Sequence, residues 1–236
     1  MHPVFTIVGA YFIVGALGTA LAARRQPPDV RSARWRKLLV YVVLVYGLIG
    51  VMMYLPEQFW MLALAIVAGG LWDLFKVRKD APLPNRFYQL SGLIFGLSAA
   101  GFMRMAHSFD SQKLLYVFLT VFCFDGFCQI FGQLLGRHKL FPRVSPNKTV
   151  EGLLGGTAAA LATSVLTRDW AGLDQLHAVG YGAVLCAAAL SGDWLASYYK
   201  RRHGVKDFSQ LIPGHGGVLD RFDSWLVAGA VAGLWM

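Results

Sequence analysis

Four carboxylates stand inside apolar stretches of this 236-residue chain. They are Asp125 in FCFDGFCQIFG, Asp193 in LSGDWLAS, and Asp220 and Asp223 in GGVLDRFDSW. A carboxylate at the centre of a membrane helix costs roughly 2.5–3.5 kcal/mol, so it persists mainly for function or for pairing. Asp220 and Asp223 are three residues apart and share one helix face, and hard carboxylate oxygens suit Mg²⁺ or Mn²⁺. These acids predict a divalent metal site.

An ordinary alternative exists for some of the acids. Acids near a helix start interact favourably with the helix dipole, and Arg221 can pair with the two that flank it. A fifth acid, Asp73, stands near the end of its apolar stretch, where pairing with Lys76 or Arg78 explains it.

A basic, glycine-rich segment comes directly before Asp220. Its cations are Lys200, Arg201, Arg202 and Lys206, and it ends with Gly214, His215, Gly216 and Gly217. Glycines let the backbone approach an anion, and the free amides and dipole of a helix start favour one. A solvated basic loop explains the cations but not the glycines. Beside acids that can hold a metal, the segment predicts phosphoryl or nucleotide chemistry.

A second basic segment, GRHKLFPRVSPNKTVEG, also combines cations with hydroxyl groups. These residues are Arg137, His138, Lys139, Arg143, Lys148, Ser145 and Thr149. Pro142 and Pro146 predict a loop whose cations are held toward a ligand. The charge that orients cytoplasmic loops remains an alternative explanation.

The elements that position these residues are predicted to be membrane helices. With 56% apolar and 15% charged residues, a soluble globule and separate soluble domains are excluded. Apolar runs predict an all-α, polytopic transmembrane helix bundle of about eight spans; they cover 3–23, 38–55, 59–75, 87–103, 114–135, 152–166, 178–199 and 218–236. The run 152–166 is rich in Gly and Ala, which favours tight helix packing. The three cysteines, Cys123, Cys128 and Cys186, are interpreted as small packing residues.

Basic residues predict the orientation of the bundle. The segments 24–37, 76–86, 136–151 and 200–221 hold 19 of the 22 Lys and Arg residues, so every second loop is basic and is expected in the cytoplasm. Both termini then face away from it, and the active site lies at the cytoplasmic face. We expect one integral membrane domain, 1–236, with N-terminal spans and basic loops in 1–113 and a catalytic half in 114–236. The charge of +9 needs no nucleic acid partner.

The two basic segments and their acids resemble the phosphatidate cytidylyltransferase (CDP-diacylglycerol synthase) family. The signature S-x-x-K-R-x4-K-D-x-S-x3-P-G-H-G-G-x2-D-R-x-D is filled at every fixed place, by Ser197, Lys200, Arg201, Lys206, Asp207, Ser209, Pro213, Gly214, His215, Gly216, Gly217, Asp220, Arg221 and Asp223. The similarity extends upstream through Gly192, Asp193 and the segment from Asp125 to Gly152, so it covers roughly 125–224.

The resemblance implies transfer of CMP from CTP to phosphatidic acid, which gives CDP-diacylglycerol and pyrophosphate in phospholipid biosynthesis. The implied metal ligands for Mg²⁺ or Mn²⁺, with a second cation allowed, are Asp193, Asp220 and Asp223, with Asp125 as a further ligand or a bundle anchor. The implied catalytic set adds Lys200, Arg201, Lys206, Arg221 and His215, the last for phosphate contact. The implied substrate-binding set is Gly214, Gly216, Gly217, Ser197, Asp207, Lys139, Ser145, Lys148 and Thr149.

The expected partners are CTP, phosphatidic acid and membrane lipids, with a homodimer as the assembly to consider, in a bacterial inner membrane. Two features depart from the family. Ala196 stands where many members have an acid, and the part before Asp125 is short, so we expect fewer helices than usual. Two other functions stay open: a CTP-dependent lipid kinase, and an ion-coupled transporter that uses the intramembrane acids.

Overall fold

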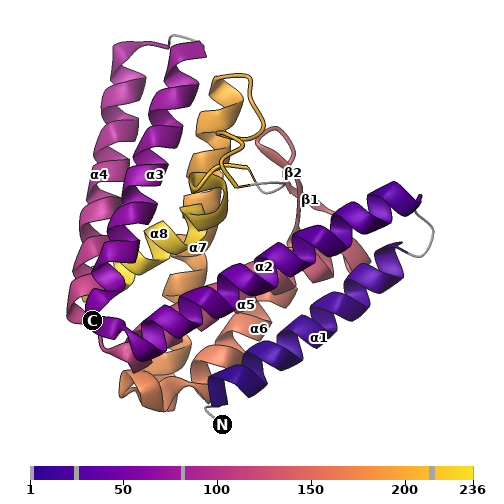
Figure 1. The fold of residues 1–236 in the computed structure, drawn as a ribbon, viewed down its shortest axis with the longest axis vertical. Helices are drawn as coiled ribbons and strands as arrows, with labels where there is room; N and C mark the ends of the chain where they lie inside the picture. Colours follow the sequence, from indigo (N-terminus) through magenta and orange to yellow (C-terminus); the bar gives the residue numbers. More distant parts are fainter. Residues whose placement is uncertain (1–2, 24–26, 81–82, 213–215, 236) are drawn as a thin grey trace.

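The structure is a computed structural model that describes residues 3–23, 27–80, 83–212 and 216–235. These residues form eight α-helices: α1 (Pro3–Ala23), α2 (Pro28–Tyr54), α3 (Phe59–Asp80), α4 (Asn85–Ser108), α5 (Ser111–Leu135), α6 (Val150–Leu166), α7 (Gln175–Arg202) and α8 (Leu219–Trp235). Two short 3₁₀ helices cover Pro56–Gln58 and Arg168–Ala171. The predicted helical architecture is therefore confirmed. Figure 1 shows α3 and α4 side by side on one flank, with α1 and α2 as a second pair.

Three helical segments are long and apolar enough to cross a membrane. They cover Pro56–Arg78, Ser111–Leu135 and Gln175–Arg202 within the part of the chain that the structure describes. Shorter apolar stretches lie at Val4–Gly18, Leu38–Tyr54 and Val150–Leu166. The described chain thus has the number of helices predicted, but length and composition mark three of them as candidate spans.

The core is built around α5 and α8. Nearly every residue from Leu114 to Phe124 on α5 is buried. On α8, the Trp225 ring packs against three phenylalanine rings from three helices, Phe59 of α3, Phe102 of α4 and Phe118 of α5, at centroid distances of 5.8, 5.1 and 5.3 Å. Such aromatic pairs hold helices at a fixed separation, so α8 is anchored at the centre of the molecule.

Small residues bring α6 directly against α5, as the sequence predicted. A Cβ atom added at Gly156 would lie 2.7 Å from the Phe124 carbonyl oxygen, and one at Gly152 would lie 2.6 Å from the Cys128 carbonyl oxygen. Contacts this close exclude any side chain, so glycine allows the two backbones to touch. Cys123 and Cys186 are buried and Cys128 is half-buried, and all three are free thiols, which confirms them as packing residues.

Two local predictions are wrong. The loop with Pro142 and Pro146 contains a two-stranded antiparallel sheet, β1 (Lys139–Phe141) and β2 (Ser145–Thr149), so the chain is not purely helical. A two-stranded ribbon has only edge strands, which tolerate proline. The basic segment 24–37 is helical from Pro28 onward, because proline fits the first turn of a helix, where its missing amide proton is not needed.

Candidate functional site

Asp220 joins the end of α7, the loop that follows it and the start of α8. Lys200 Nζ donates a hydrogen bond to Asp220 Oδ1 at 2.6 Å, and the Phe208 and Gly217 amides each donate to Oδ2 at 2.8 Å. The Lys200 side chain is 10% exposed and that of Asp220 is 3% exposed. This ion pair is shielded from water and is supported by further hydrogen bonds. It therefore holds the end of α7, the following loop and the start of α8 together.

The glycine loop before α8 is folded around the same carboxylate. Gly216 has a φ of 86°, and a Cβ atom there would lie 2.7 Å from Asp220 Oδ2. The Gly217 amide, which the sequence predicts to face a phosphate, is directed at Asp220 here. Two other members of the predicted loop, Gly214 and His215, lie outside the described residues.

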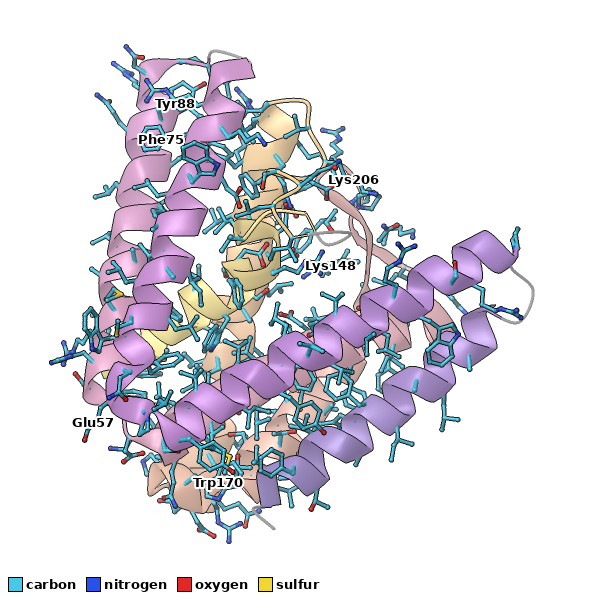
Figure 2. All side chains as sticks on the ribbon, viewed as in Figure 1. Glu57, Phe75, Tyr88, Lys148, Trp170 and Lys206 are labelled. Carbon is cyan, nitrogen blue, oxygen red and sulfur yellow. The ribbon has the colours of Figure 1, made fainter. Side chains whose placement is uncertain are left out.

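Asp193 on α7 forms an ion pair with Lys148 on β2. Lys148 Nζ lies 2.5 Å from Asp193 Oδ2, and the two side chains are 24% and 22% exposed. Burial alone would lower the pKa of Lys148, but the carboxylates of Asp193 and Asp125 outweigh it and raise that pKa above its usual value. Lys148 therefore stays protonated at neutral pH. Figure 2 shows Lys148 near the β1–β2 hairpin, on the same side of the molecule as Lys206.

Asp125 and Asp223 interact electrostatically with Asp193 and with each other, so these acids form one group. Asp193 is a charged neighbour of both. Asp223 is buried, and its Oδ1 accepts a hydrogen bond from the Ser224 amide at 2.7 Å. The structure thus gathers acids from α5, α7 and α8 into one neighbourhood, with lysines from β2 and α7 beside them.

These acids suit a divalent cation by their chemistry, because they supply hard oxygen donors and several negative charges in partly desolvated surroundings. Within the described ranges, no three His, Cys, Asp or Glu side chains converge closely enough to hold a metal ion. Asp220 faces Lys200 and Asp193 faces Lys148 instead. The metal-ligand set of Asp193, Asp220 and Asp223, with Asp125, stays a prediction.

Two of the other predicted site residues have structural contacts. The Arg201 guanidinium donates to the Val144 carbonyl at 3.1 Å and to the Val205 carbonyl at 3.0 Å, which ties α7 to the hairpin. Thr149 accepts a hydrogen bond from the Gly152 amide at 3.1 Å and so caps α6. Both residues hold the site's framework in place.

The remaining predicted residues divide by exposure. Ser197 is buried on α7 and Ser145 is half-buried at the start of β2. The exposed ones are Lys139, Lys206, Asp207 and Arg221. A substrate-binding role for these residues stays a prediction.

Two carboxylates beside the site make contacts that the sequence did not predict. Glu151 accepts from the Arg137 amide at 3.0 Å and contacts His138 Nδ1 at 2.6 Å, which fastens the entry of the hairpin to α6. Asp73 was predicted to pair with Lys76 or Arg78 near the interface, and this is wrong. Its side chain is fully buried, and Oδ2 accepts a hydrogen bond from the Leu219 amide at 2.9 Å. The Asp73 contact spans 146 positions of sequence, and the Glu151 contacts close the hairpin over 13 and 14 positions, so neither follows from a periodic pattern within one helix.

The fold and the site define a helical protein with membrane-compatible helices, in which acids from several helices meet lysines and a glycine loop. Residues 87–236 match the model of the cytidylyltransferase family. The match covers more than half of the chain, so this protein belongs to the cytidylyltransferase family, as the sequence motifs predicted.

Curated relatives carry a more specific name. The chain is similar to phosphatidate cytidylyltransferases of Staphylococcus epidermidis, with 37% identity over 153 residues, Staphylococcus haemolyticus, with 41% over 150 residues, and Staphylococcus aureus, with 39% over 150 residues. Each match covers 60% of this chain and 58% of the relative, so it spans less than two thirds of the relatives' length.

Proposed function

We propose that this protein transfers CMP from CTP to phosphatidic acid and releases pyrophosphate. The observation that carries the proposal is the pair of lysine–carboxylate contacts, Lys148 with Asp193 and Lys200 with Asp220, the second of which lies at the glycine loop. Reactions between polyanions need such cations beside acids that can hold a metal. The name of the staphylococcal relatives supports the same reaction.

The reaction does not require a strong general base from the protein. A phosphate oxygen of phosphatidic acid attacks the α-phosphorus of CTP, the bond from that phosphorus to the bridging oxygen of the β-phosphate breaks, and pyrophosphate leaves with the electron pair. A phosphate monoester has a second pKa near 6 and is already ionised at neutral pH. The protein's work is to reduce anion repulsion, to align the two reactants and to stabilise the leaving group.

In this scheme the cations of the site bind phosphates. Lys148 and Lys200 are held in place by Asp193 and Asp220, so their charges are pre-organised for a polyanion. Three exposed residues add further positive charge to the site: Arg201, Lys206 and Arg221. Asp193, Asp220 and Asp223, with Asp125, would hold Mg²⁺ or Mn²⁺, which when bound offsets the charge on the phosphates. A second cation fits the number of acids.

The lipid acceptor places the reaction at a membrane. We propose that the chain is a multi-pass integral membrane protein of about eight spans, that its site faces the cytoplasm, and that its membrane is the bacterial inner membrane. The three long apolar segments and the basic loops support this arrangement. CTP would then approach from the cytoplasm, while phosphatidic acid arrives within the bilayer.

Position-specific labelling of CTP tests the reaction directly. Purified protein in micelles that contain both phosphatidic acid and diacylglycerol, with Mg²⁺, is given CTP labelled at either the α- or the γ-phosphate. Transfer of CMP carries only the α-label into lipid and leaves the γ-label in pyrophosphate. Transfer of the γ-label to a lipid alcohol would instead show a lipid kinase. Absence of label in lipid, with dissipation of an ion gradient in proteoliposomes, would show a transporter.

A further inference from the structure

Asp73 lies on α3, before the segment that matches the family, yet it contacts the first residues of α8. Its side chain is 0% exposed, and the Leu219 amide donates to Oδ2 at 2.9 Å across 146 positions of sequence. The second oxygen, Oδ1, is buried and has no hydrogen-bond partner in the described part of the chain. Buried carboxylate oxygens without a partner are costly and rare, so this position calls for an explanation.

The face of α3 around Asp73 is shaped to receive the start of α8. A Cβ atom at Gly69 would lie 2.8 Å from Val218 Cγ2, and one at Gly70 would lie 3.4 Å from Leu219 Cδ1. Gly217 packs so closely on the Asp73 carboxylate that a Cβ atom there would collide with both oxygens. Two glycines on α3 and one before α8 therefore let the backbone settle onto the acid.

Two carboxylates thus hold the same short stretch of backbone from different elements. Asp220 accepts from the Gly217 amide, and Asp73 accepts from the Leu219 amide two residues later. The Leu219 amide is the first of α8 and has no partner within the helix, and the Gly217 amide lies two residues before it. A negative charge at a helix start is favoured by the helix dipole. Asp220 directly follows Leu219, and Asp223 follows about one turn further on, so the contact with Asp73 sets where both acids lie.

A further contact ties α3 to α7 at the same level. The Tyr199 hydroxyl donates to the Leu74 carbonyl at 3.2 Å, one residue after Asp73. Tyr199 is six residues beyond Asp193 on α7. The segment of α3 around Asp73 therefore contacts both α7, which carries Asp193, and α8, which carries Asp220 and Asp223.

We propose that Asp73 is a positioning residue, which fixes the first turn of α8 and thereby places Asp220 and Asp223 for the proposed transfer of CMP. The inference rests on the proposed function for its catalytic consequence. The hydrogen bond by which Asp73 holds the start of α8, here called the Asp73 clamp, is a property of the fold alone. Its chemistry is that of a helix-capping acceptor supplied by another helix, so an amide oxygen can replace it in part.

The test compares Asp73→Ala, Asp73→Asn and Asp110→Ala in the full-length protein. Asp110 is the matched control, because it also accepts from a helix-start amide, that of Lys113 at 2.9 Å, but it caps α5 and is exposed. Hydrogen exchange of the peptide covering 217–223 should become about tenfold faster in Asp73→Ala and change little in Asp110→Ala. Asp73→Asn keeps one acceptor oxygen and should show a smaller increase.

Activity gives the second readout. The Mg²⁺ concentration for half-maximal CMP transfer should rise about fivefold or more in Asp73→Ala, fall back toward the wild-type value in Asp73→Asn, and stay unchanged in Asp110→Ala. An active Asp73→Ala protein with wild-type exchange at 217–223 and wild-type Mg²⁺ dependence would overturn the proposal. A wild-type protein that transfers no CMP would instead contradict the proposed function. The exchange data would still test whether Asp73 holds the start of α8.

Discussion

Lys148 Nζ on β2 lies 2.5 Å from Asp193 Oδ2 on α7. The hairpin that carries Lys148 is fastened to the start of α6 by Glu151, through the Arg137 amide and the His138 ring. The lysine therefore approaches α7 on a short support that is anchored twice, and its charge is held beside Asp193.

Lys148→Met should lower kcat/KM for CTP by roughly a hundredfold or more, because one fixed donor to a developing charge is worth about that much. Lys148→Arg should retain part of the activity, since it keeps the charge but changes its geometry. The lipid-linked label from α-labelled CTP measures both. Lys113→Met, at the first turn of α5, is the matched control and should leave the rate unchanged. A Lys148→Met protein with near-normal kcat/KM would assign this lysine to the framework alone.

Gly216→Ala should abolish most of the activity. Backbone strain alone does not explain this expected loss. Gly216 and Gly172 both have positive φ values, 86° and 67°, so alanine costs roughly 1–2 kcal/mol of backbone strain at either position. A Cβ atom at Gly172 meets nothing within 4 Å, whereas one at Gly216 meets Asp220 Oδ2. Gly172→Ala should therefore lower only the melting temperature, and Gly216→Ala should also lower turnover of the folded protein. Equal turnover in the two variants would argue against a catalytic role for the loop.

Asp220→Asn and Asp223→Asn should both lose Mg²⁺-dependent transfer but should differ in stability. Asp220 is paired with Lys200, and breaking a buried ion pair costs roughly 3–5 kcal/mol, so Asp220→Asn should melt at a clearly lower temperature. Asp223 has no ion pair in the described residues, so Asp223→Asn should melt at or above the wild-type temperature. Thermal unfolding in detergent and the rate as a function of Mg²⁺ separate the two effects. Near-normal rates with unchanged Mg²⁺ dependence in either variant would remove that acid from the metal site.

The sequence predicted the parts of this site that lie close together in the chain. The spacing of Asp220 and Asp223 and the glycines before them indicate a helix start with acids on one face, and the structure has this arrangement. Acids inside apolar stretches also stand out in the sequence, which is why it predicts Asp125 and Asp193 as site residues.

Long-range partners could not be predicted in the same way. Asp73 was assigned to a local ion pair because Lys76 and Arg78 are its nearest cations in sequence, yet its hydrogen-bond partner is 146 residues away. The β1–β2 hairpin was missed because Pro142 and Pro146 are typical of a loop, and only the antiparallel partner strand makes Ser145 to Thr149 a strand. The sequence of a single chain shows helical periodicity and turn-forming residues. It does not show which distant backbone amide contacts which carboxylate.

The basic loops predict which positions an impermeant reagent can reach. In a protein whose three cysteines are replaced by Ala or Ser, single cysteines are introduced at Arg143 and Lys206 on the site side, and at Gln112 and Asp169 on the other side. All four positions are exposed in the structure, so burial does not confound the comparison. Because 19 of the 22 Lys and Arg residues lie in alternate segments, Arg143→Cys and Lys206→Cys should be labelled only after the cells are opened, whereas Gln112→Cys and Asp169→Cys should be labelled in intact cells. Labelling of the cysteine at position 206 from outside would place the glycine loop away from the cytoplasm, and with it away from the supply of CTP.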